Sequence, residues 1–368
     1  MVNLSLIAVD WYVDLLRYRM NDSPAIDLQL TEEKMRGSLR NQVPYYNPQR
    51  PDQPCNTGPP VTLDAFMNEI NTDKNLATQG GRIIETTYST CNVNIKVDPG
   101  RLAQAPWLTP AGKPVVQNIP LQIPGSYLQK DVIAIMDLIN MNFYKRPIYF
   151  AVTCQPSKFL GLQDYMQLEG LALQLTATRT ADAPDGMYPP NIGAGTVDVD
   201  KNYDLIMNKW MWGNFDQEDT HVNTSYTPAI QSMQQIMLRT MNELVNRGDT
   251  ERALEIGDKY FQAFPNMNFP FFFEAFTMLS PYFSTGNLDR VNDVVVQLAQ
   301  NTADKLRYFD SLEPERVAMS YSFEDRRAQY MAQQLLLQLQ NSEATELREK
   351  VEAILADYSY LANPATPG

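Results

Sequence analysis

Cys154 is the side chain in this sequence that is best placed to act as a nucleophile. It ends the segment KRPIYFAVTC (residues 145–154), which predicts a buried strand that follows a turn containing proline. A cysteine nucleophile needs a neighbouring base, and the only histidine of the chain, His221, lies in a different part of the sequence. Burial would also raise the pKa of the thiol and make it less reactive. We therefore expect Cys154 to pack as a small apolar residue in the core or at the edge of a sheet.

A run of acidic residues provides the second candidate for chemistry. The segment TVDVDKNYDLI contains Asp198, Asp200 and Asp204, and this spacing is similar to a calcium loop or to the DxD motif of enzymes that use sugar nucleotides. The calcium loop is excluded because Tyr203 stands where the loop needs glycine, and Lys209 stands where it needs a bidentate glutamate. A single DxD motif is common by chance, so we expect these acids to be solvated loop residues.

A third group of polar side chains has the composition of a metal site. It comprises Asp216, Glu218, Asp219 and His221, although a solvated polar loop is the simpler interpretation. None of the three candidates provides a nucleophile, a base and an orienting group together. The sequence therefore predicts no catalytic residue, no cofactor and no metal for this chain.

Composition limits the classes of function that remain. The chain has 368 residues, of which 44% are apolar, and its formal net charge is −13. An acidic surface repels phosphate groups, so nucleic acid is not an expected partner. No stretch reaches 18 consecutive apolar residues, and the start has no signal-peptide pattern. Because the chain opens almost at once on a strand-and-helix pattern, we expect it to be part of a longer protein.

Residues 1–226 predict an α/β or α+β layer domain with a mixed sheet and proline-rich loops. One helix is expected with Trp11, Leu15 and Tyr18 on one face, and a second over residues 127–142. The region 178–226 is expected to form loops with a short helix near residues 201–208. Short apolar or alternating runs predict strands at residues 3–9, 82–88, 92–97, 148–153 and 171–175. Strands and helices in this order are typical of a layered domain.

Residues 227–368 have an almost entirely helical pattern. Two segments, RGDTERALEIGDKYFQAFP and TGNLDRVNDVVVQLAQNTA, align Gly248 with Gly286 and Ala253 with Val291, so the period is 38 residues. A fixed period in this range predicts stacked helical hairpins similar to tetratricopeptide repeats. In such a domain Ala253 is expected at the closest approach of two helices.

Aromatic residues of the helical part are the candidates for binding a partner. The run FPFFFEAF (269–276) is typical of repeat core, and it can also line a peptide groove. If any of them is exposed, the residues best suited to contact a partner are Tyr260, Phe271, Phe272 and Tyr282.

Four motifs occur together in an order that is similar to a known family: NLSLIAVDWYVDLLR, KRPIYFAVT, LEGLALQL and KWMWGNFD. They resemble the C-terminal soluble region of a Bacteroidetes family of polytopic membrane proteins that is similar to protein O-mannosyltransferases. The resemblance implies a location on the periplasmic face of the inner membrane, next to the N-terminal transmembrane domain of the same protein. It also implies that the catalytic carboxylate lies in that absent domain, so this chain alone is not an enzyme. Its role would be to bind an acceptor polypeptide or another partner.

A periplasmic location leads to an expectation about the cysteines. Three cysteines allow three pairings. Cys55 and Cys91 both lie in irregular or strand-end segments and could pair, while Cys154 stays buried and reduced. Two alternatives to the resemblance remain open at this point. The chain is then either an independent secreted binding protein with helical repeats, or an enzyme that uses the acidic loops of residues 198–219.

Overall fold

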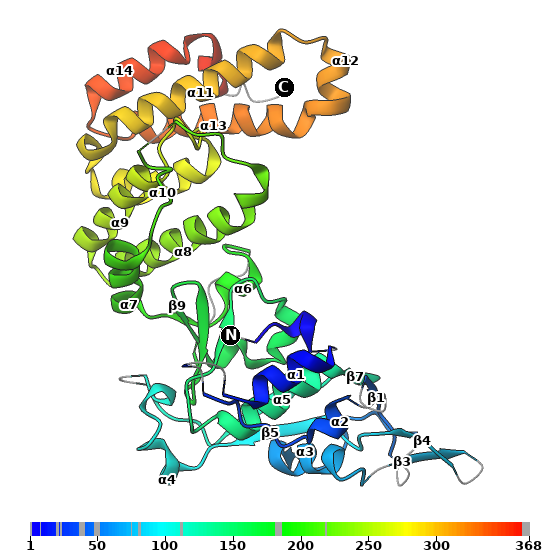
Figure 1. Ribbon diagram of the computed structural model, residues 1–368. Coiled ribbons are helices and arrows are strands. Elements are labelled where there is room, and N and C mark those ends of the chain that lie inside the picture. Colours follow the sequence, from blue (N-terminus) through cyan, green and yellow to red (C-terminus); the bar gives the residue numbers. More distant parts are fainter. Residues whose placement is uncertain are drawn as a thin grey trace. The chain divides into compact units, whose positions relative to one another are not determined.

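The structure is a computed structural model that describes residues 2–7, 9–19, 22, 24–36, 41–47, 52–74, 76–79, 82–110, 113–180, 186–217 and 219–362. The chain forms two compact units, Met1–Thr196 and Val197–Gly368 (Figure 1). The first unit combines sheets and helices and the second is helical, which confirms the predicted fold class. The boundary lies at Thr196, whereas the sequence pattern placed it after residue 226.

The segment before residue 227 belongs to the second unit because its helix is bonded to later helices. Helix α7 (Val199–Asp204) carries Asn202, whose buried amide donates to Thr240 Oγ1 at 3.2 Å. Asp200 of the same helix accepts from Arg252 Nη1 at 2.6 Å. A π-helical turn, η6 (Leu205–Lys209), follows α7, close to the short helix that was predicted near residues 201–208.

The strands of the first unit form several small sheets. The strands are β1 (Gln42–Pro44), β2 (Val61–Thr62), β3 (Leu76–Gln79), β4 (Arg82–Thr86), β5 (Asn92–Lys96), β6 (Asn118–Gln122), β7 (Tyr127–Gln129), β8 (Tyr149–Ala151), β9 (Met166–Glu169), β10 (Ala172–Leu175) and β11 (Thr196–Val197). Strand β5 pairs in parallel with β2 and antiparallel with β6, so this sheet is mixed, as predicted. The largest sheet has the order β11-β9-β10-β8. The predicted strands at 82–88 and 92–97 both exist but do not pair with each other, because β4 pairs with β3.

The helical elements of the first unit are mostly short. They are η1 (Leu4–Leu6), α1 (Asp10–Arg17), α2 (Glu32–Arg36), α3 (Leu63–Asn71), α4 (Pro99–Leu102), η3 (Pro106–Leu108), α5 (Lys130–Asn142), η4 (Pro156–Phe159), η5 (Leu162–Tyr165) and α6 (Pro190–Gly193). The strand predicted at residues 3–9 is wrong, because the chain forms the 3₁₀ turn η1 there. The Asn3 side chain accepts from the Ser5 amide and favours this turn over an extended backbone.

Helix α5 organises the core of the first unit through a buried carboxylate. Asp137 is fully buried and accepts hydrogen bonds from the backbone amides of Gln29, at 2.8 Å, and Leu30, at 3.0 Å. Burial raises the pKa of this carboxyl above its ordinary value, and the two backbone bonds oppose the rise. Asn142, at the end of α5, donates to the Asp27 carbonyl at 2.8 Å. These bonds hold the segment from Asp27 to Leu30 against the helix.

The cysteines form one bridge and leave one free thiol. Cys55 and Cys91 form a disulfide with a Cα–Cα distance of 5.0 Å, which confirms the predicted pairing. Cys154 is a free thiol, as predicted, but it is half-buried rather than buried. It lies in the turn after β8, where the strand has already ended at Ala151, so part of its surface remains accessible.

The second unit is built from helical hairpins (Figure 1). Its later elements are η7 (Thr224–Tyr226), α8 (Thr227–Asn246), α9 (Thr250–Ala263), α10 (Phe273–Thr285), η8 (Leu288–Val291), α11 (Asn292–Asp310), α12 (Pro314–Arg316), η9 (Val317–Tyr321), α13 (Ser322–Gln340), α14 (Thr345–Ile354) and η10 (Ala356–Ala362). Gly248 and Gly286 occupy equivalent turns, after α8 and after α10, with φ angles of 79° and 74°. Glycine adopts this left-handed conformation without strain, so the alignment of the two segments has a structural basis.

Gly257 marks a close approach between helices of this unit. A Cβ atom on this residue of α9 would lie 2.3 Å from Tyr282 Oη and 2.9 Å from Met241 Cε. Ala253, the residue predicted at the closest approach, lies on the same helix and is fully buried. The repeat pattern therefore identified a buried position of this helix, one turn before the close contact at Gly257.

Candidate partner-binding pocket

The acidic residues of the DxD-like segment make structural contacts. Asp198 caps α7 by accepting from the Lys201 amide at 3.1 Å, and Asp204 accepts from Asn208 Nδ2 at 2.8 Å. Asp200 pairs with Arg252, as described above. Each of these carboxylates therefore has a structural contact of its own.

The polar cluster before α8 does not gather a set of ligands in the part that the structure describes. Asp219 and His221 are exposed, Asp216 is half-buried, and Glu218 lies outside the described residues. Across the described part of the chain, no three His, Cys, Asp or Glu side chains are grouped as metal ligands would be. The best nucleophile candidate is also unsuited to catalysis, because burial raises the pKa of the Cys154 thiol against the smaller opposing effect of Lys158.

Three of the four predicted partner-binding residues are buried in the repeat core. Tyr260 is 2% exposed, Phe271 is 5% exposed and Tyr282 is 0% exposed. The Tyr282 hydroxyl is hydrogen-bonded inside the unit. Its oxygen lies 3.0 Å from the Leu254 carbonyl oxygen and 2.8 Å from Asp258 Oδ1, and both atoms act as acceptors. Their surfaces are thus occupied by packing, and the condition of exposure is met only by Phe272, which is half-buried.

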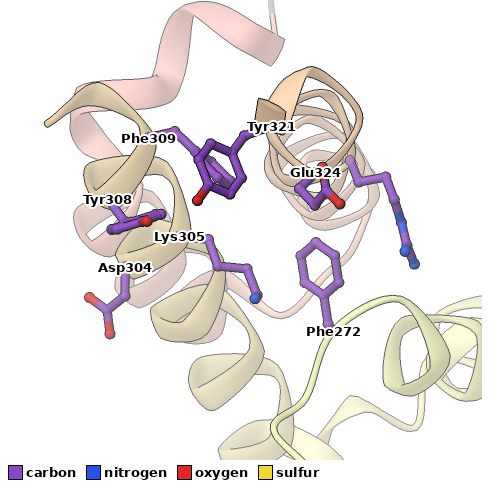
Figure 2. A pocket seen from close by; sticks show the side chains of 8 residues that line it. Phe272, Asp304, Lys305, Tyr308, Phe309, Tyr321 and Glu324 are labelled. Carbon is purple, nitrogen blue, oxygen red and sulfur yellow. The ribbon is translucent and has the colours of Figure 1, made fainter. Parts of the chain in front are cut away.

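Phe272 lines a surface cavity of about 540 Å³ between the hairpins of the second unit (Figure 2). This cavity, here called the aromatic pocket, is formed by the residue before α10, one face of α11, the end of η9 and the first turns of α13. Its lining consists of Phe272, Asp304, Lys305, Tyr308, Phe309, Tyr321, Glu324 and Arg327.

Aromatic rings in edge-to-face and tilted contact form one wall of the aromatic pocket. The ring centroids of Tyr308 and Phe309 lie 5.5 Å apart, and Tyr321 lies 6.2 Å from Tyr308 and 6.0 Å from Phe309. Figure 2 shows Tyr321 beside Phe309. A hydrogen bond with Tyr321 raises the pKa of the Tyr308 hydroxyl. Tyr321 ends the π-helical turn η9, a rare geometry that is frequent at functional sites.

Two cations lie at the ring of Phe272. Lys305 Nζ is 5.1 Å and Arg327 Cζ is 5.4 Å from the centroid of this ring, and Figure 2 shows Lys305 extending toward it. Arg327 also lies 5.2 Å from the ring of Phe273 and 5.6 Å from that of Phe323. Within the described residues, neither cation has an acidic partner within salt-bridge distance. These contacts are cation–π interactions, which leave the N–H donors able to bind an anion.

A second cavity, of about 300 Å³, adjoins the first and shares Phe272 with it. It lies among α8, α9 and the loop that leads into α10. Gln231 and Gln234 of α8 contribute amides to its lining, beside apolar side chains such as Ile230 and Phe269. The two cavities together provide room for more than one side chain of an extended ligand.

Sequence reasoning identified Phe272 but missed Lys305, Tyr308, Tyr321 and Arg327. The buried stripe of α11 includes Leu298, Leu306 and Phe309, whereas Tyr308 is 49% exposed. A large aromatic residue off the buried stripe was the available signal. The position of Arg327 near Phe272 depends on the packing of α13 beside α11 and was not visible in the sequence.

Residues 1–201 match the family model described as TMEM260-associated domain 2. The chain belongs to this family. TMEM260 is a protein O-mannosyltransferase-like family, and its members are glycosyltransferase-like membrane proteins, which agrees with the resemblance seen in the sequence motifs. No curated protein and no solved structure matches the chain.

The match to TMEM260-associated domain 2 covers the first unit and ends within α7. The aromatic pocket lies in the helical unit beyond the matched residues. Of the helices in the described residues, none is both long and apolar enough to cross a membrane.

Proposed function

We propose that this chain is a non-catalytic region of a glycosyltransferase-like membrane protein and that its helical unit binds the acceptor polypeptide or a protein partner. The observation that carries the proposal is the aromatic pocket on an array of helical hairpins. It presents the exposed ring of Tyr308 beside half-buried rings, and two cations that have no acidic partner among the described residues. Such arrays bind extended chains along their surface. Aromatic and arginine side chains are the types that dominate binding energy at protein interfaces.

Two further observations support this proposal. The acids that suggested sugar-nucleotide chemistry cap a helix or form internal contacts. The Cys55–Cys91 disulfide fits an oxidising compartment such as the periplasmic face of the inner membrane.

The first unit also has a surface that suits the transmembrane domain of the same protein as its partner. On α1, Trp11 is 60% exposed and Leu15 is 39% exposed, at the i, i+4 spacing of one helix face. Tyr18, the residue after the helix, has an extended backbone and is 58% exposed. Tryptophan and tyrosine are enriched where a protein meets the membrane interface. We propose that this face lies next to the membrane-embedded part.

The experiment that tests the proposal compares the full-length protein with a version truncated after Thr196. Both are assayed for transfer of sugar to acceptor polypeptide and, separately, for binding of the lipid-linked sugar. We expect truncation to weaken acceptor recognition and to leave donor binding unchanged. The isolated chain is assayed in parallel and is expected to turn over no donor.

Controls make the result decisive. Resistance to protease and the intact Cys55–Cys91 bridge establish that the first unit is folded in the truncated protein. If the truncated protein modifies acceptors at the full-length rate, the helical unit has no recognition role. If the isolated chain transfers sugar, the non-catalytic assignment is wrong.

A further inference from the structure

We infer that the aromatic pocket binds an acidic segment of polypeptide, with a large apolar side chain between the rings and a neighbouring carboxylate at Lys305 and Arg327. This inference rests on the proposed function of the helical unit and names the chemistry of its ligand.

Among the described residues, the pocket cations lack the ion pairs that several other basic residues of the same unit make. Arg290 pairs with Glu251 at 3.2 Å and also with Asp258, and Lys350 pairs with Glu346 at 2.9 Å. Lys305 and Arg327 instead contact aromatic faces, although the chain carries a net charge of −13 and acids are abundant. A guanidinium has five donors and binds a carboxylate through two of them. The uncommitted donors therefore favour a carboxylate from outside the chain.

The acidic residues of the pocket restrict the ligand to a small negative charge. Glu324 lines the pocket and lies on α13, one turn before Arg327. Asp304 is already engaged, because it accepts from Arg307 Nη1 at 3.1 Å and from Gln300 Nε2 at 2.9 Å. Within the described part of the chain, Glu324 has no basic partner. With the Asp304–Arg307 pair counted as neutral, Glu324, Lys305 and Arg327 leave a single positive charge for the ligand. A single carboxylate matches this charge, whereas a phosphate chain would be repelled by Glu324.

The shape of the aromatic pocket and of the adjoining cavity suits an extended peptide. The pocket of about 540 Å³ is walled by rings, and aromatic side chains pack against such walls with an energy beyond their buried area. The adjoining cavity of about 300 Å³ shares Phe272, so neighbouring side chains of one segment can occupy both cavities. The amides of Gln231 and Gln234, which line the second cavity, are suited to bonds with the ligand backbone.

The test uses the whole chain and three fluorescein-labelled peptides of equal length in a glycine–serine background. The first contains Glu-Phe, the second Gln-Phe and the third Glu-Gly. Fluorescence anisotropy at low and at moderate salt measures each dissociation constant. We expect the Glu-Phe peptide to bind at least tenfold more tightly than the other two, and more weakly as salt is raised.

Variants of the chain assign the binding to the pocket. The double substitution Lys305→Gln and Arg327→Gln is expected to weaken binding of the Glu-Phe peptide at least tenfold. The matched control is Arg326→Gln, because Arg326 is exposed on the same helix, does not line the pocket and donates to the Ser322 carbonyl at 2.9 Å. This control is expected to leave binding unchanged, and thermal unfolding verifies that all variants are folded.

Several results would overturn the inference. These are equal binding of the Glu-Phe and Gln-Phe peptides, no binding of any peptide at millimolar concentration, and an equal loss in the Arg326→Gln control. Displacement of the peptide by a neutral oligosaccharide would make the pocket a saccharide site and would also contradict it. If truncation after Thr196 weakens acceptor recognition while the peptides show no preference, the proposed function holds and only this inference fails.

Discussion

The substitution Gly257→Ala probes how closely the hairpins of the helical unit are packed. The new Cβ atom would lie 2.3 Å from Tyr282 Oη, 2.8 Å from Tyr282 Cε2 and 2.9 Å from Met241 Cε. Tyr282 cannot yield easily, because it is fully buried and its hydroxyl is bonded to the Leu254 carbonyl and to Asp258. We therefore expect α9 and α10 to separate locally or Tyr282 to lose its bonds.

The expected magnitude follows from two opposing effects. Alanine is favoured over glycine inside a helix by about 1 kcal/mol. Overpacking a core costs about 1–3 kcal/mol, and loss of the Tyr282 bonds inside the protein adds about 1–3 kcal/mol. The net result is a destabilisation of about 1–5 kcal/mol, opposite in sign to the effect of helix propensity alone.

The assay is urea unfolding of the whole chain, with hydrogen exchange of the α9 and α10 amides to assign the change to the helical unit. A double-mutant cycle with Tyr282→Leu provides the control, because removal of the ring relieves the clash. In that background Gly257→Ala should be neutral or stabilising. A stabilising effect of Gly257→Ala in the original protein would refute the close packing of Gly257 and Tyr282.

Three further predictions concern the first unit. Replacing Cys55 and Cys91 by alanine should lower its free energy of unfolding by about 3–4 kcal/mol on the chain-entropy model, and urea unfolding with and without reductant measures this. Asp137→Asn leaves one of the two backbone donors poorly satisfied and should cost about 1–3 kcal/mol. Folding raises the pKa of Asp137, so the folded protein binds the carboxyl proton more tightly than the unfolded chain does. The contribution of Asp137 to the free energy of unfolding is therefore largest below the ordinary carboxyl pKa, and it falls as pH rises through the pKa of the folded state. The cost of Asp137→Asn should thus increase as pH is lowered from about 7 to about 4, and a constant cost would contradict the raised pKa. Alkylation of Cys154 should require a higher pH than alkylation of a free thiol, whereas an unshifted profile would show that burial does not affect it.

The two-part fold was predictable because its signals are local. The helical periodicity after residue 227 and the 38-residue repeat identified the hairpins, since the turn residues Gly248 and Gly286 are set by backbone conformation. The strand predicted at residues 3–9 failed because an apolar run does not distinguish a strand from a turn. There the Asn3 side chain decided the outcome through a bond to the backbone.

The candidate site was only partly predictable because it is built from distant positions. Phe272 lies in a conspicuous aromatic run, but its neighbours Lys305 and Arg327 come from two later helices. Their proximity depends on the packing of α11, α13 and the α10 hairpin. The same packing buries Tyr260 and Tyr282, which have the same residue type as the exposed Tyr308. Residue type alone could not separate these roles.

The position of the unit boundary decides how the helical unit should be removed. A truncation at residue 227, where the helical pattern begins, would leave α7 without the helices that it contacts. The buried amide of Asn202 would lose Thr240, and Asp200 would lose Arg252. Tyr203, whose hydroxyl bonds to Glu255 and has its pKa raised to about 12 mainly by that bond, would also become exposed. An exposed α7 without these contacts would itself destabilise the truncated protein. Loss of acceptor recognition after such a cut could therefore not be assigned to removal of the aromatic pocket. Truncation after Thr196 removes α7 together with its contacts and takes only Val197 from the edge strand β11. Once the first unit is shown to be folded, the effect of this cut can be attributed to the helical unit.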